Sequence, residues 1–153
     1  MKRFKFSLQT VHNVRELQLE KEEITLSDLL AEAMRAEEQL TLNRQMRLEA
    51  AETYSRKLRE REPLSAYEME MHTKHLHSLD RSIEQASALV EEKKEAVRIQ
   101  REVVAAAGKA VKVTERLRDF QEDRHRTELA RTEQTDLDEM VSSGFARGLV
   151  HAK

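Results

Sequence analysis

The sequence is poor in residues that make turns and cross-links: it has no cysteine, one proline and three glycines among 153 residues. Without cysteine, the chain has no disulfide, no thiolate ligand for a metal and no cysteine nucleophile. Proline and glycine punctuate chains, so their scarcity does not fit the many turns of a compact globular domain. The sequence therefore predicts a small number of long, uninterrupted elements.

Apolar residues are also scarce. Hydrophobic residues make up 39% of the chain and aromatic residues 4%, whereas 37% of residues are charged. A compact globule needs a thick apolar centre, but a coiled coil buries only a narrow stripe along each helix. Abundant alanine, glutamate, lysine, leucine and arginine are typical of coiled coils as well. The composition thus predicts an all-α coiled coil.

No strong excess of one charge is present, because the net charge is -2 and acidic and basic residues are interleaved. Phosphate binding needs a clear basic excess, so we expect no nucleic-acid ligand. Long hydrophobic runs are missing too: Gln9, His12 and Glu16 interrupt the N-terminal segment before a signal-peptide core can form. Since no segment is apolar enough to span a bilayer, any membrane association is expected to be peripheral.

One break divides the chain, at Pro63. Proline cannot continue a helix, because it lacks an N–H and its ring clashes with the preceding turn. The segment Ser65-Ala66-Tyr67-Glu68 then matches a capping box, in which each of the two end side chains accepts from the other residue's N–H. We predict helix one over about 10–61, a turn over about 62–65, and helix two over about 66–140.

Helix two carries the clearest periodicity. Hydrophobic residues recur every seven positions without a miss and define a predicted coiled-coil seam: Met69, Leu76, Ile83, Val90, Val97, Val104 and Val111. A companion row three residues further along is weaker and contains His72, Lys93 and Gln100. One row that is rich in hydrophobic residues and one row that is poor in them are typical of a thin two-stranded seam. Helix two is therefore predicted to pair with a single partner helix.

Folding the chain about Pro63 predicts a hairpin that pairs residue 63−k with residue 63+k. After Val111 the hydrophobic residues leave the seven-residue row and continue as Val113, Leu117 and Phe120. In the hairpin register we expect Phe4, Phe6 and Phe120 to meet there. Residues beyond about 122 would overhang as a single helix, and the tail 141–153 should fray. The predicted fold is one all-α domain over 1–153: a long antiparallel two-helix coiled-coil hairpin with an overhanging C-terminal helix.

Candidates for chemistry are few. His72 and His75 are spaced i,i+3 and can touch one ion, but His77 points to another face and a third ligand is missing. His12, His125 and His151 are isolated in the sequence. A two-helix rod also lacks a concave pocket, and no Gly-rich loop is present to hold a phosphate. We therefore expect no metal, no cofactor and no enzymatic activity.

Three motifs, in this order and spacing, resemble the FliJ family, the small coiled-coil stalk of the bacterial flagellar type III export ATPase. The first motif is Phe6-Ser7-Leu8 followed by Val11, Val14 and Arg15-Glu16. The second is Leu64-Ser65-Ala66 followed by Leu76, Leu79 and Ile83-Glu84-Gln85. The third is Leu137-Asp138-Glu139. The resemblance spans nearly the whole chain.

The resemblance implies a non-enzymatic protein that binds a hexameric export ATPase, a membrane export-gate protein and export chaperones. The implied location is cytoplasmic, peripheral at the cytoplasmic face of the inner membrane in the flagellar basal body. Candidates for binding the ATPase ring are Phe6, Leu8, Val11, Arg15, Leu137, Asp138 and Glu139. Candidates for binding the export gate are His75, Leu79, Ser82 and Ala86. The latter are spaced 4, 3 and 4 residues apart and share one helix face, but the heptad pattern also assigns Leu79 and Ala86 to the seam.

Two alternative functions fit the same sequence. One is the equivalent stalk of a virulence-type injectisome, and the other is a structural coiled coil that self-associates. A monomeric hairpin favours a stalk, whereas a parallel dimer with a helix running straight through residue 63 favours self-association. Because a single row rich in hydrophobic residues and the turn at Pro63 suit an intramolecular hairpin, we expect a monomer in isolation.

Overall fold

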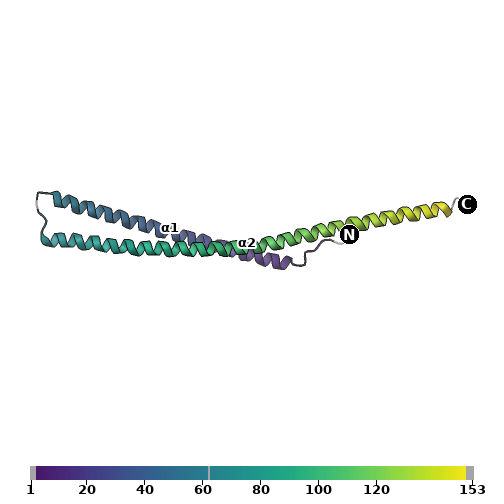
Figure 1. Ribbon diagram of the computed structural model, residues 1–153, viewed down its shortest axis with the longest axis horizontal. Helices are drawn as coiled ribbons and strands as arrows, with labels where there is room; N and C mark the ends of the chain where they lie inside the picture. The colour runs from purple at the N-terminus through teal and green to yellow at the C-terminus, as the bar shows by residue number, and fades with distance from the viewer. Residues whose placement is uncertain (1–2, 62, 151–153) are drawn as a thin grey trace. The chain divides into compact units, whose positions relative to one another are not determined.

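The computed structural model describes residues 3–61 and 63–150, and within them all regular structure is helical. α1 runs over Gln9–Arg59 and α2 over Ala66–Val150 (Figure 1). The two helices are antiparallel and are joined by the turn that contains Pro63, which confirms the predicted all-α helical hairpin. Glu62 of the predicted turn and residues 151–153 of the predicted tail lie outside the described residues.

The start of α2 has the predicted capping box. The Ser65 N–H donates to Glu68 Oε2 at 2.8 Å, and the Glu68 N–H donates to Ser65 Oγ at 3.2 Å. These bonds satisfy donors that the first helical turn leaves without intrahelical partners. The Ser65 N–H and then its hydroxyl, both donating to the carboxylate, hold the pKa of Glu68 below its ordinary value of 4.5.

The chain divides into two compact units, which are described separately. The turn unit is Glu20–Ala106 and contains the connection between the helices. The terminal unit combines the described residues of Met1–Leu19 and of Ala107–Lys153. In each unit, a part of α1 packs against a part of α2.

The turn unit has a thin core. Ala36 and Leu40 of α1 form one buried cluster with Ala86 and Val90 of α2, and Ile83 packs against it. The two alanines bring the helices close together, while the larger side chains supply most of the apolar area that is removed from water. A core this narrow is what a two-stranded seam provides, because each helix buries only one stripe.

The predicted register holds in the turn unit. Tyr54 and His72, each nine residues from Pro63, stack with their ring centroids 5.0 Å apart. Two polar residues of α1 also have hydrogen-bond partners on α2. Asn43 Nδ2 donates to the Ser82 carbonyl at 3.4 Å, and Arg47 Nε donates to an Asp80 carboxylate oxygen at 2.8 Å.

Both heptad rows of α2 contribute to the seam, although the sequence pattern emphasises one. In the predicted row, Val90, Val97 and Val111 are buried, and Leu76, Ile83 and Val104 are partly buried. Met69 is different, with 39% of its surface exposed. Its counterpart in the register is Lys57, an exposed residue two positions before α1 ends at Arg59. Met69 therefore lies at the poorly packed end of the seam, near the turn.

An ion pair replaces apolar contact at one position of the companion row. Lys93 Nζ donates to Glu32 Oε2 across the seam at 2.7 Å. This hydrogen bond and the positive charge of Lys93 lower the pKa of Glu32, and the same contacts raise the pKa of Lys93.

The predicted phase shift in the terminal unit is wrong. Val113 and Phe120 are 60% and 61% exposed, so neither is packed in the seam as predicted. The ring of Phe4 lies instead 5.7 Å from the ring of His125. The seam continues along the seven-residue row through Val111 and His125. Phe120 follows Val111 by nine residues, which places it about 180° around the helix.

The end of α2 also differs from the prediction. The helix continues through Val150 rather than ending near residue 140, so the described part of the predicted frayed tail is helical. Every described side chain from Arg131 to Gly148 is exposed. An established helix gains one hydrogen bond for each residue it adds, so serine and glycine weaken it without ending it. None of the helices in the described part of the chain has a stretch long and hydrophobic enough to cross a membrane.

Candidate functional site

The start of α1 presents an apolar surface to solvent. Four aliphatic residues spaced three apart are exposed there: Leu8, Val11, Val14 and Leu17. His12 and Arg15, which lie between them, face α2 instead. Polar side chains thus face α2 in this segment, and the apolar side chains on the free side are available to another protein. We call Leu8, just before α1, together with Val11, Val14 and Leu17 the N-terminal apolar surface; each member lies about 60° further around the helix than the one before, so the surface winds around the helix.

The residues expected to face the ATPase ring near the N-terminus lie in different surroundings. Leu8 and Val11 belong to the N-terminal apolar surface, and Phe6 is partly buried. Arg15 is also partly buried, and its Nη1 donates to the Ala110 carbonyl at 2.9 Å. Its guanidinium therefore joins α1 to α2 and is not wholly free for a partner.

The ring-facing candidates on α2 are all exposed. Asp138 accepts a hydrogen bond from Gln134 Nε2 at 3.1 Å, one turn earlier on the helix, while Leu137 and Glu139 point to solvent. Leu137 begins an exposed stripe that we call the C-terminal apolar surface: Leu137, Met140, Val141 and Phe145. Phe145, the most exposed of these at 73%, lies beside Gly144 and Gly148 in a shallow groove.

The predicted export-gate stripe is largely inside the seam. Leu79 and Ala86 are buried against α1, and Ser82 is partly buried with its carbonyl accepting from Asn43. Of the four residues, only His75 is exposed. The heptad pattern thus describes the environment of Leu79 and Ala86, whereas His75 lies on the exposed surface.

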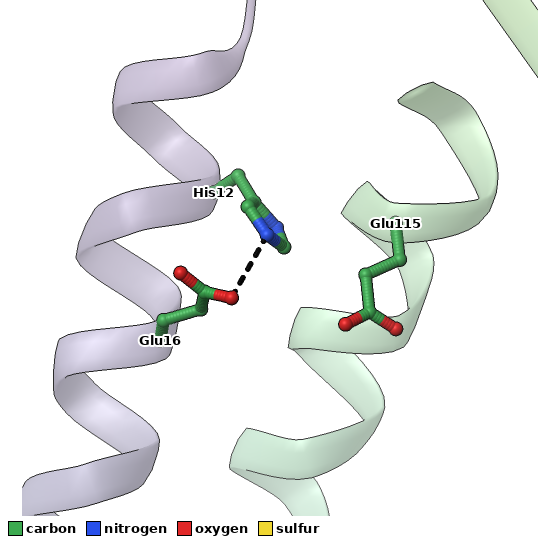
Figure 2. Close-up of side chains that lie close together, drawn as sticks. All are labelled: His12, Glu16 and Glu115. Atoms are coloured by element: carbon green, nitrogen blue, oxygen red, sulfur yellow. Dashed lines mark ion pairs between the residues drawn. The ribbon is translucent and has the colours of Figure 1, made fainter. Parts of the chain in front are cut away.

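A polar cluster occupies the seam of the terminal unit, where Figure 2 shows His12 and Glu16 extending from α1 toward Glu115 on α2. His12 is 3% exposed, and its Nδ1 lies 2.7 Å from Thr114 Oγ1. Its Nε2 lies 3.1 Å from Glu16 Oε1. His12 and Thr114 are both 51 residues from Pro63, so the hairpin register brings them together.

The comparisons with known proteins add one positive finding. The family model described as Flagellar FliJ protein matches residues 4–149. The chain belongs to the FliJ family. No curated protein and no solved structure matches the chain. Membership of the FliJ family makes the chain a component of the flagellar export apparatus, in a family of structural and adaptor proteins rather than enzymes.

Sequence reasoning about this FliJ-family chain missed the polar cluster. His12 and His125, which are isolated in the sequence, each contact a residue more than a hundred positions away. The i,i+4 spacing of His12 and Glu16 was visible in the sequence. Glu115 could have been assigned to the same cluster only by pairing residue 63−k with residue 63+k for polar residues as well as for apolar ones. His151 lies outside the described residues.

Proposed function

We propose that this chain is the stalk and adaptor of the flagellar type III export ATPase. In this role the terminal unit binds the hexameric ATPase ring and promotes its activity, and no chemistry occurs on the chain itself. The observation that carries the proposal is the N-terminal apolar surface, formed by Leu8, Val11, Val14 and Leu17 on a family member of the export apparatus. Exposed aliphatic side chains grouped on one helix are typical of a protein-binding site.

The C-terminal apolar surface supports the same proposal. It belongs to the terminal unit and includes Leu137, which lies beside Asp138 and Glu139 in the third family-like motif. Apolar side chains next to acidic ones suit a ring surface that offers hydrophobic pockets with basic rims. We propose that both surfaces contact the ATPase.

The experiment is ATP hydrolysis by the purified cognate export ATPase, titrated with the full chain. The wild-type chain should stimulate hydrolysis, and Leu8→Ala/Val11→Ala should weaken that stimulation because two exposed contacts are lost while the seam stays intact. Leu42→Ala/Leu48→Ala, which removes exposed leucines from the turn unit, is the matched control and should stimulate normally. If the wild-type chain neither stimulates the ATPase nor co-migrates with it, the proposal is wrong.

For the export gate, we propose that the early part of α2 makes the contact and that His75 is reached first. Leu79, Ser82 and Ala86 would join the contact only where α1 and α2 separate. Binding of the cytoplasmic part of the gate protein should weaken in His75→Ala and stay unchanged in His77→Ala, an exposed control on another face. Equal binding by both variants would remove this stripe from the proposal. Export chaperones are proposed as further partners, and the cytoplasmic face of the inner membrane as the location.

Neither alternative function is favoured by a specific observation. The matched family is described as flagellar, which supports the flagellar system over an injectisome. The turn between Arg59 and Ala66 and the seam within one chain support a hairpin over a parallel dimer with a continuous helix.

A further inference from the structure

The cluster of His12, Glu16 and Glu115 in the terminal unit has no role in the proposed function. One possible ligand atom from each residue lies within 4.8 Å of those of the other two. His12 is buried, Glu115 is partly buried, and the Glu16 side chain is 53% exposed. The cluster therefore has an inner side closed by the helices and an outer side open to water.

Thr114 determines which nitrogen of His12 carries a proton. Its hydroxyl donates to a backbone carbonyl, that of Val111 at 2.8 Å. A hydroxyl has a single proton, so toward His12 Nδ1, 2.7 Å away, Thr114 Oγ1 accepts. Nδ1 is then the protonated nitrogen, and in the neutral ring Nε2 keeps its lone pair. A hydrogen bond that holds the second ring nitrogen in this way is usual for histidines that bind a metal.

The lone pair of Nε2 faces a carboxylate. Glu16 Oε1 lies 3.1 Å from Nε2, and Glu115 brings a second carboxylate to the same place. Two acceptors at this distance repel unless a proton or a metal ion lies between them. Neither Glu16 nor Glu115 forms an ion pair with a lysine or arginine among the described residues, so no permanent cation already neutralises them.

We propose that His12 Nε2, Glu16 and Glu115 bind one divalent first-row transition-metal ion, with Zn²⁺ as the natural candidate. One imidazole nitrogen and two carboxylate oxygens suit Zn²⁺, and a water on the open side completes a four-coordinate site. Mg²⁺ and Ca²⁺ prefer sites made of oxygen alone. The two carboxylates balance the charge of the ion.

Only Glu115 has to adjust for this coordination. Ligand atoms about 2.0–2.2 Å from a tetrahedral ion lie about 3.3–3.6 Å from one another, close to the 3.1 Å between His12 Nε2 and Glu16 Oε1. No hydrogen bond or ion pair holds the Glu115 side chain within the described part of the chain, so a rotation can bring its carboxylate closer. The bound ion then ties the start of α1 to α2 and stabilises their pairing, because it binds the paired state and not the separated helices.

Zinc binding by the full chain tests the proposal. The metal-free protein is titrated with ZnCl₂ by isothermal titration calorimetry, alongside Glu115→Gln and Glu16→Gln, which remove one carboxylate each and keep its size. We expect one site that weakens at least about tenfold in each variant, as loss of a ligand requires. Glu133→Gln, at an exposed site on α2, is the control and should bind like wild type. Binding that is unchanged in Glu115→Gln and Glu16→Gln would overturn the proposal.

A second measurement separates this site from binding at other histidines. Zn²⁺ should slow amide hydrogen exchange in residues 9–19 and 107–118 of the wild type and leave these segments unchanged in Glu115→Gln. Thr114→Val should weaken Zn²⁺ binding, and Thr114→Ser, which keeps the hydroxyl, should restore it. Zinc that binds without slowing exchange in these segments would show that the ion sits elsewhere. These results do not depend on the ATPase role, because none of them involves the ATPase.

Discussion

At the residue scale, stability rests on a small number of buried side chains. Val90, Val97 and Val111 on α2 are only 4–6% exposed, and α1 contributes only Ala36 and Leu40 at comparable burial among the described apolar residues. Burial contributes roughly 25 cal/mol for each Å² of apolar surface, so a seam this thin contributes only a small free energy of unfolding. Truncating one of its members therefore removes a large share of the apolar stabilisation.

Two valines in the terminal unit test which face of α2 is packed. Val111→Ala should destabilise the protein by about 1–2 kcal/mol, because two buried methyl groups are lost. Val113→Ala, two residues away on the exposed face, should change stability by less than about 0.5 kcal/mol. Urea unfolding followed by circular dichroism measures both. A larger loss in Val113→Ala than in Val111→Ala would support the phase shift that the structure contradicts.

The capping box predicts a sensitivity to acid. The folded pKa of Glu68 is lowered, so its contribution to stability is fully present above 4.5 and is lost as the pH falls through the lowered value. Glu68→Gln should be less stable than wild type at neutral pH, and the difference should shrink in acid. The measurement is the free energy of unfolding as a function of pH. Glu91→Gln, at an exposed site on the same helix, is the matched control and should keep the wild-type acid response.

At the element scale, the notable feature is the length of α2. The helix begins at a well-formed cap and continues through three glycines to Val150 with no residue in a left-handed conformation among those described. Nothing lies within 4 Å of a Cβ built on Gly108, Gly144 or Gly148. These glycines are therefore tolerated rather than required by the described structure, and each weakens the helix by about 1 kcal/mol relative to alanine.

Alanine at these positions tests the extension of α2. Gly144→Ala/Gly148→Ala should slow amide hydrogen exchange in residues 141–148, because the helix there becomes more stable without any clash. Global unfolding should hardly change, since this stretch has only exposed side chains. Gly108→Ala, in the paired part of α2, should instead stabilise the whole protein by up to about 1 kcal/mol. Exchange at the rate of an unfolded chain in both the wild type and the double variant would show that residues 141–148 are not helical.

At the scale of the whole molecule, the hairpin makes the seam an internal contact of one chain. Ala36 and Val90 lie 27 residues on either side of Pro63 and share one buried cluster. The chain contains no cysteine, so an introduced pair can cross-link only with itself or with another copy. This makes the register and the oligomeric state testable together.

Ala36→Cys/Val90→Cys should form a disulfide within one chain on mild oxidation, because the two side chains belong to the same buried cluster. The product should migrate as a monomer on a non-reducing gel. Ala36→Cys/Leu89→Cys, with the second cysteine on an exposed position, is the control and should cross-link poorly. A cross-linked dimer from the first pair would contradict the hairpin and support self-association.

Local rules explain most of what could be predicted from the sequence. Pro63 and the Ser65–Glu68 box fix where one helix stops and the next starts, since both act through bonds to nearby backbone. The seven-residue row identifies the packed face from Leu76 to Val111, because the periodicity of a helix is set by its backbone geometry. Together these features determine the fold and the register, and the order of the motifs indicates the FliJ family.

Only the tertiary structure determines the polar contacts of the seam and which side chains are buried or exposed near its ends. Phe120 is more hydrophobic than Arg118 or His125, yet it faces solvent, because the face is set by the packed helix upstream and not by local hydrophobicity. His12 meets Thr114 and Glu115 because two helices paired far away bring them together, and no local signal in the sequence carries that information. Short-range bonding therefore gave this protein its helices and its turn, whereas long-range packing determined the surroundings of its buried histidine and the surfaces it leaves exposed.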